Sequence, residues 1–168
     1  TNAGFKAGMR LESYLPRIQG YPNRFDGTGL GMRYVGYSNS KVDVTLGHFY
    51  EQFGNGLALR AYEDRALGYD NVLDGARIIF KPFKGIQIKG VYGQQRLSFE
   101  AGRVVNSDGI VRGIDADIHL NETFAKLSAF PLDVILGGSF VSKYQIDDDD
   151  QLVLPENVGA YGGRMKLQ

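Results

Sequence analysis

The stretch Gly113-Ile114-Asp115-Ala116-Asp117-Ile118-His119-Leu120-Asn121 alternates glycine or polar residues with apolar ones over its whole length. Successive side chains of a β-strand point to opposite faces of a sheet, so this period of two separates an apolar face from a polar face. One face could meet lipid while the other meets water. The same pattern recurs along the chain and decides the fold class.

Short and long connections alternate between the segments that carry this pattern. Turns at 38–41 and 82–85 are short, and the connections at 15–29, 51–74 and 100–109 are long, as in barrels with periplasmic turns and external loops. The region 124–131 is intermediate and is assigned to the periplasmic side. The predicted strands are Phe5 to about Tyr14, Leu30–Tyr34, Val42–Leu46, Ala76–Phe80, Ile86–Tyr92, Ile110–Asn121, Val134–Tyr144 and Tyr161–Leu167.

The sequence therefore predicts an all-β fold, an antiparallel up-and-down transmembrane β-barrel with about eight strands in this piece. We expect residues 1–168 to form either a single barrel domain or the N-terminal portion of a larger barrel. Thr1 follows no basic, apolar leader, so we expect the signal peptide of such a protein to have been removed or to lie outside this piece.

Composition excludes several other classes of protein. Lys plus Arg number 19 and Asp plus Glu number 19, so the net charge of zero gives no electrostatic basis for binding nucleic acid. The absence of cysteine excludes disulfides, thiol nucleophiles and zinc-thiolate sites. No apolar run reaches 18 residues, which excludes a transmembrane helix.

Alternation alone also fits a soluble barrel or sandwich, in which the apolar face would lie inside. We favour the membrane barrel, because glycines on the polar side would leave a soluble surface bare. We therefore expect apolar side chains to point away from the barrel and charged ones to line a lumen. The glycines are Gly8, Gly31, Gly47, Gly113 and Gly137.

The long connection 51–74 concentrates charged residues. Folded into a barrel, it could narrow a pore, and paired Arg and carboxylate groups would select solutes by charge and size. The alternative, which we favour, is a surface or lumen loop held by ion pairs that each contribute little if exposed. The candidate pore-lining or loop ion-pair residues are Glu51, Arg60, Glu63, Arg65, Asp70 and Arg77.

Other constellations give weaker signals. Asp147–Asp150 lack the spacing of a calcium loop, and His48 and His119 are isolated, so we expect no metal and no cofactor. Asp115 and Asp117 would lie about 7 Å apart on one strand face, as in an inverting glycosidase, but strands supply such pairs routinely. We therefore expect no enzyme activity.

The segment GHFYEQFGNGLALRAYEDRALGYDNVLDGAR, residues 47–77, resembles an uncharacterised family of outer-membrane β-barrel proteins from Bacteroidota-type bacteria. The resemblance extends over about residues 27–96, and members of that family look longer than 168 residues. It implies a barrel fold and an outer-membrane location but no activity. Its most specific positions are Phe49–Gly54, Gly56, Leu57, Leu59, Arg60, Tyr62, Glu63, Leu67, Gly68, Asp70 and Asn71.

These observations lead to one expected function and two alternatives. We expect a porin-like barrel of the Gram-negative outer membrane, surrounded by outer-membrane lipid, that acts as a passive pore or envelope scaffold. The first alternative is a barrel subunit of a larger secretion or uptake assembly, with other envelope proteins as partners. The second is a soluble β-barrel that binds a small ligand or glycan.

Overall fold

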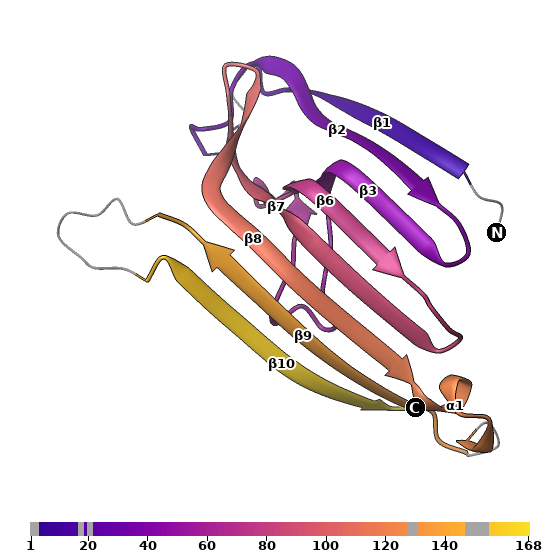
Figure 1. Ribbon diagram of the computed structural model, residues 1–168. Coiled ribbons are helices and arrows are strands. Elements are labelled where there is room, and N and C mark those ends of the chain that lie inside the picture. The colour runs from indigo at the N-terminus through magenta and orange to yellow at the C-terminus, as the bar shows by residue number, and fades with distance from the viewer. Residues whose placement is uncertain (1–3, 17–18, 20–21, 128–130, 147–154) are drawn as a thin grey trace.

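The computed structural model describes residues 4–16, 19, 22–127, 131–146 and 155–168, and the protein is all-β. A single antiparallel sheet of eight strands dominates the molecule (Figure 1). Its strands are β1 (Gly4–Ser13), β2 (Thr28–Ser38), β3 (Val42–Phe49), β6 (Leu73–Phe80), β7 (Ile86–Glu100), β8 (Arg103–His119), β9 (Val134–Tyr144) and β10 (Asn157–Leu167).

The remaining elements are short. The strands β4 (Glu63–Asp64) and β5 (Tyr69–Asp70) pair with each other in the connection between β3 and β6. After β8 come the four-residue helix α1 (Leu120–Thr123) and the 3-10 turn η1 (Ala125–Leu127). No helix among the described residues is both long and apolar enough to cross a membrane.

Each strand of the main sheet pairs with its neighbours in the chain, in the order β1-β2-β3-β6-β7-β8-β9-β10. This confirms the predicted antiparallel up-and-down topology. The expected closure into a barrel is not seen, because β1 pairs only with β2 and β10 only with β9 among the described residues. The two strands lie at opposite edges of a curved, open sheet (Figure 1).

The predicted loop at 100–109 is wrong, because β7 and β8 form one long hairpin that turns at Ala101 and Gly102. Both turn residues have positive φ, 49° and 78°. A Cβ at Gly102 would approach the carbonyl oxygen of Thr28 to 2.3 Å, so only glycine fits. The hairpin end is stabilised from outside the hairpin, since Phe99 is fully buried and exchanges backbone hydrogen bonds with the segment 24–26.

The two faces of the sheet have opposite chemistry, and β8 and β9 show the orientation that alternation predicts. On β2 the predicted orientation is wrong, because Arg33 lies with the apolar residues of the open face and Tyr34 covers Gly8 on the inner face. On β8, Ile114 is 53% exposed, whereas Asp115 is 1% exposed. On β9, Phe140 is 49% exposed and pairs in register with Ile114. On these strands the apolar side chains therefore lie on the open face of the sheet, and Asp115 lies on the face that the rest of the chain covers.

Candidate functional site

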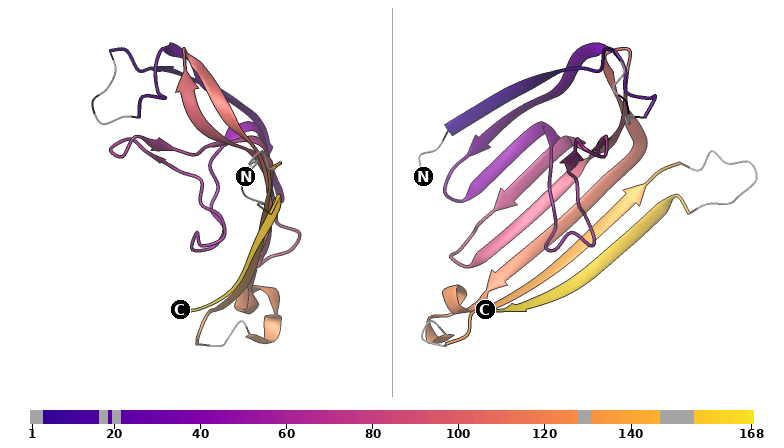
Figure 2. Two further views of the ribbon diagram at one scale, coloured as in Figure 1. Left: turned by 90° about the vertical axis from the view of Figure 1, so that its left-hand side faces the viewer. Right: turned by 180° about the vertical axis from the view of Figure 1, so that it is seen from behind.

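The connection between β3 and β6, residues 50–72, folds over the charged face of the sheet, and we call it the inner loop. Figure 2 shows it on the concave side of the curved sheet. The hydrophobic core of the protein lies between the inner loop and the strands. Its buried members are Phe49, Phe53, Leu59, Ala61, Leu73, Val91, Val111 and Val141.

Phe53 is the apolar anchor of the inner loop. Its side chain is 1% exposed and packs in the core with Val91, Val111 and Val141. A Cβ at Gly113 would come within 2.7 Å of the Phe53 ring, so the glycine leaves the space that the ring occupies. Large side chains also lie over Gly8, Gly31 and Gly137, so these glycines of the polar face are not bare, whereas Gly47 faces the backbone of Arg33.

Five charged residues, Arg10, Glu12, Glu63, Asp70 and Arg96, form the Arg96 cluster. Arg96 Nη1 lies 2.9 Å from Asp70 Oδ2, and Arg96 Nη2 lies 2.8 Å from Glu12 Oε2. Arg10 Nη1 donates to Glu63 Oε2 at 2.8 Å. Because β1 supplies Glu12, β7 supplies Arg96 and the inner loop supplies Asp70, the cluster ties the loop to two strands.

A second group, the Arg77 cluster, consists of Lys6, Asp43, Glu51, Arg77 and Lys89. Glu51, at the start of the inner loop, accepts from Lys89 Nζ at 2.7 Å and lies 3.5 Å from Arg77 Nη1. Asp43 accepts from Arg77 and from Lys6. The Glu51 side chain is only 7% exposed, so this tether is largely screened from bulk water.

The Arg164 cluster, Asp115, Asp117, Ser139 and Arg164, lies at the β10 edge. Arg164 contacts Asp115 through Nη1 and Asp117 through Nη2, both at 2.7 Å. Ser139 donates to Asp115 at 2.6 Å. Both carboxylates are therefore held by one guanidinium, an arrangement that joins β8, β9 and β10 and leaves neither aspartate as a free acid or base.

The ionisation of two tyrosines reflects their place beside the Arg96 cluster. Burial and the neighbouring Glu12 carboxylate raise the pKa of Tyr14 to about 12. Burial and Asp70 hold the pKa of Tyr50 above its usual range, and the Tyr50 hydroxyl donates to Asp70 Oδ1 at 2.9 Å. Both hydroxyls therefore stay protonated near neutral pH and act as hydrogen-bond donors.

Four of the six residues predicted from the sequence lie in these clusters. Glu51 and Arg77 meet in the Arg77 cluster, and Glu63 and Asp70 meet in the Arg96 cluster. The other two contact residues of the inner loop itself. The Arg60 guanidinium lies 4.4 Å from the centre of the Tyr62 ring, and Arg65, 73% exposed, pairs with Glu63 of its own loop.

The sequence did not identify Arg96, which the structure places at the centre of its cluster with no exposed side-chain surface. The pairing of β7 with β8 shifts register on both sides of Arg96, so alternation does not reveal which face it points to. Arg10 and Glu12 do lie on the polar side of the first predicted strand. Alternation therefore predicts the face on which they lie, but the sequence around them does not show that they contact the inner loop.

No group of three or more metal-binding side chains gathers among the residues that the structure describes. The acidic run Asp147–Asp150 lies outside the described residues. The charged clusters contain cations and carboxylates in contact with one another. Their chemistry is thus mutual neutralisation and the fixing of the inner loop on the concave face.

Residues 1–168, the whole chain, match DUF6029, a family of unknown function. No curated protein and no solved structure matches the chain. The family match does not specify a membrane location or a bacterial group.

Proposed function

This chain belongs to the DUF6029 family, and we propose that it forms part of the wall of a bacterial outer-membrane β-barrel that acts as a passive pore or envelope scaffold. The observation that carries the proposal is the reversed placement of side chains, with apolar residues on the open face and charged residues against the inner loop. In soluble sheets the apolar face is the covered one.

The open face carries exposed apolar side chains on strands from one edge of the sheet to the other, interrupted by the exposed arginines Arg33 and Arg112. Monomeric soluble proteins rarely expose contiguous apolar surface larger than a few hundred Å², and larger patches mark membrane or protein contacts. A soluble ligand-binding barrel would bury these residues instead. Exposed apolar residues of this face are Phe5, Met9, Leu11, Leu30, Val35, Leu46, Ile78, Phe80, Tyr92, Ile114, Ile118, Leu136, Phe140, Tyr161, Met165 and Leu167.

The strand lengths support the same proposal. A tilted strand crosses the hydrocarbon layer with about 9 to 11 residues. The strands β1, β2, β9 and β10 have 10 or 11 residues, β7 and β8 are longer, and β3 and β6 have eight each. The short turns 39–41 and 81–85 then fall at one end of the sheet, as periplasmic turns do.

The inner loop indicates a barrel of more than eight strands. The interior of a closed eight-stranded barrel is just wide enough for side chains to fill. Here the concave face holds a chain segment with its own pair of strands, which needs a wider lumen. The unpaired edges of β1 and β10 are templates on which further strands can pair.

The lumen of such a barrel would be polar and partly occupied. The Arg96, Arg77 and Arg164 clusters would line it with charges of both signs, and the inner loop would narrow it. The proposed function is therefore the restricted, passive passage of small solutes. No catalytic role is part of the proposal.

The test is single-cysteine labelling. The chain has no cysteine of its own, so each variant reacts only at the introduced position. Tyr161→Cys and Ala160→Cys change adjacent, exposed residues of β10 that point to opposite faces of the sheet. In native outer membranes, Tyr161→Cys should react with a maleimide dissolved in lipid and resist a charged, impermeant maleimide. Ala160→Cys should show the reverse preference.

The same variants, labelled after extraction into detergent and denaturation, give the total reactive cysteine. If both variants react equally with the charged reagent in membranes, the proposed orientation is wrong. Recovery of the full-length protein in the soluble fraction without detergent would also overturn the proposal.

The unpaired edges also favour a second candidate, a subunit of a larger envelope assembly. Strands of another chain could pair with β1 or β10 by the same backbone hydrogen bonds. A native gel of membranes extracted in mild detergent would distinguish the two candidates. A pore made of this protein alone should migrate as a single species whose mass is a multiple of its own chain, whereas an assembly should contain other proteins as well.

A further inference from the structure

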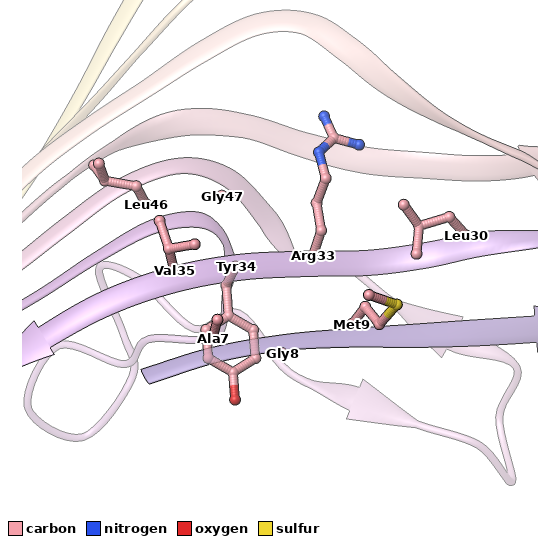
Figure 3. Close-up of a pocket in the computed structure, with 9 residues that line it drawn as sticks. All are labelled: Ala7, Gly8, Met9, Leu30, Arg33, Tyr34, Val35, Leu46 and Gly47. Carbon is pink, nitrogen blue, oxygen red and sulfur yellow. The ribbon is translucent and has the colours of Figure 1, made fainter. Parts of the chain in front are cut away.

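A groove on the apolar face lies across β1, β2 and β3. Its volume is about 810 Å³, within the range of ligand pockets in proteins. The residues that line it are apolar except for the cation Arg33 and for Tyr34 (Figure 3). The apolar lining consists of Ala7, Met9, Leu30, Val35 and Leu46.

The register of the strands places Arg33 on the apolar face. Arg33 pairs with Met9, and Val35 pairs with both Ala7 and Leu46. Arg33 and Tyr34 leave β2 in opposite directions (Figure 3). Tyr34 covers Gly8 on the inner side, which leaves the guanidinium of Arg33 beside the groove.

The Arg33 guanidinium is open to an external anion. Its side chain is 64% exposed, and it donates no hydrogen bond within the part of the chain that the structure describes. Among the described residues it makes an ionic contact with Asp74, at 3.8 Å from Nη2 to Oδ2. That carboxylate oxygen also lies 3.8 Å from His48 Nε2 and accepts from Asn106 at 3.4 Å, so its charge is shared among three groups.

We propose that this groove binds an anionic phospholipid, with an acyl chain along the apolar lining and the phosphate on Arg33. The inference rests on the proposed function, because the apolar face meets lipid only if the sheet spans a membrane. An arginine on a lipid-facing surface is costly, and the Asp74 carboxylate at 3.8 Å is shared with His48 and Asn106, so a phosphate would complete the neutralisation of Arg33. Guanidinium and phosphate form paired, charge-assisted hydrogen bonds, which makes phosphate a suitable anion.

The test uses native mass spectrometry of the full-length protein in neutral detergent, titrated with dioleoyl phosphatidylglycerol or dioleoyl phosphatidylcholine. The wild-type protein should retain one phosphatidylglycerol in preference to phosphatidylcholine. Arg33→Gln should weaken phosphatidylglycerol binding about tenfold, the loss expected for one charged hydrogen-bonding pair, and leave phosphatidylcholine binding unchanged. Ala7→Phe, which fills the groove without a change of charge, should weaken both.

The matched control is Arg112→Gln, which removes a second exposed arginine from the same face on β8, in register with Tyr92. It should keep the wild-type preference, and an equal loss in this variant would overturn the site in favour of diffuse charge attraction. Retention of the preference by Arg33→Gln would also overturn it. Glycerol phosphate, which has no acyl chain, should not compete, and competition would disprove the role of the groove.

These outcomes are separate from the labelling test of the proposed function. Heat-dependent gel mobility of each variant establishes that it is folded before lipid is added. A barrel with the expected labelling pattern but no lipid preference would overturn the lipid site alone. Failure of the labelling pattern would overturn both inferences.

Discussion

Arg96 Nη1 and Asp70 Oδ2 lie 2.9 Å apart and join the long β7–β8 hairpin to the inner loop across the concave face. The Arg96 side chain is fully buried and the Asp70 side chain is 6% exposed. Removal of one partner from a buried ion pair typically costs about 3–5 kcal/mol, and Arg10 Nη2, 3.3 Å from Asp70 Oδ2, keeps the cost here at the lower end of that range. This contact is therefore the polar lock that holds the inner loop in place.

Arg96→Gln should release the inner loop without unfolding the sheet. Loss of about 3 kcal/mol in docking free energy corresponds to roughly a hundredfold faster hydrogen exchange through local opening. The amides to follow by exchange and mass spectrometry are those of residues 60–72, including Tyr62, whose N–H donates to Asn71 Oδ1. Unchanged exchange in this segment would contradict the lock.

Arg65→Gln is the matched control for this prediction. Arg65 also pairs with a carboxylate, Glu63, but it is 73% exposed and both residues belong to the inner loop. Exposed ion pairs contribute only about 0–1 kcal/mol. Exchange of residues 60–72 should therefore change by less than about tenfold in this variant.

Phe53→Ala should destabilise the protein by about 3–5 kcal/mol, the usual cost of deleting a buried phenylalanine. The ring fills the space above Gly113, so Gly113→Leu should expel it and cost a comparable amount. Denaturant unfolding in detergent measures both variants. If Phe53→Ala costs less than about 1 kcal/mol, the apolar anchor assigned to the inner loop is wrong.

Local alternation was sufficient to predict the strands, because the period of two is a property of consecutive residues. It failed at 100–109, where Asn106, Ser107, Asp108 and Gly109 have the composition of a turn. Those residues belong to β8 because the far end of the hairpin packs on Phe25 through Phe99, a contact between distant segments. Composition contains no information about such a contact.

The candidate site was predicted in part for the same reason. Glu51, Glu63 and Asp70 were recognisable as charges concentrated in one connection, but their partners lie on strands far away in the chain. Pairing between such residues follows from how the inner loop packs, which depends on Phe53 and the glycine beneath it. A charge in this connection does not by itself predict a place in a cluster. Arg60 belongs to the same connection, but its guanidinium stacks on Tyr62 and joins none of the three clusters.

The stability of the folded protein should fall at alkaline pH. The pKa of Tyr14 is raised from 10 to about 12, so above pH 10 the unfolded chain loses this proton before the folded protein does. The stabilisation is complete below about 10 and is lost as the pH rises through about 12. Unfolding midpoints measured over this interval should fall, and the fall should be shallower in Tyr14→Phe.

Undocking of the inner loop should increase the conductance of the pore. The double variant Phe53→Ala, Arg96→Gln removes the apolar anchor and the polar lock but keeps the length of the chain. In planar bilayers its single-channel conductance should exceed that of the wild-type protein, because the loop no longer narrows the lumen. Heat-dependent gel mobility must first show that the barrel is intact.

The charges of the inner loop should set ion selectivity independently of its docking. Arg60 and Arg65 are exposed on the inner loop and contact Tyr62 and Glu63 of the same loop, so Arg60→Ala, Arg65→Ala removes two cations and leaves the Arg77 cluster and the Arg96–Asp70 contact in place. Fewer positive charges in the lumen lower the barrier to cations, so reversal potentials in a salt gradient should shift toward cation selectivity. If Arg60→Ala, Arg65→Ala leaves the ion selectivity unchanged, the inner loop does not lie in the path of the permeating ions. If Phe53→Ala, Arg96→Gln also leaves the conductance unchanged, the pore is wrong and the envelope scaffold is the remaining function.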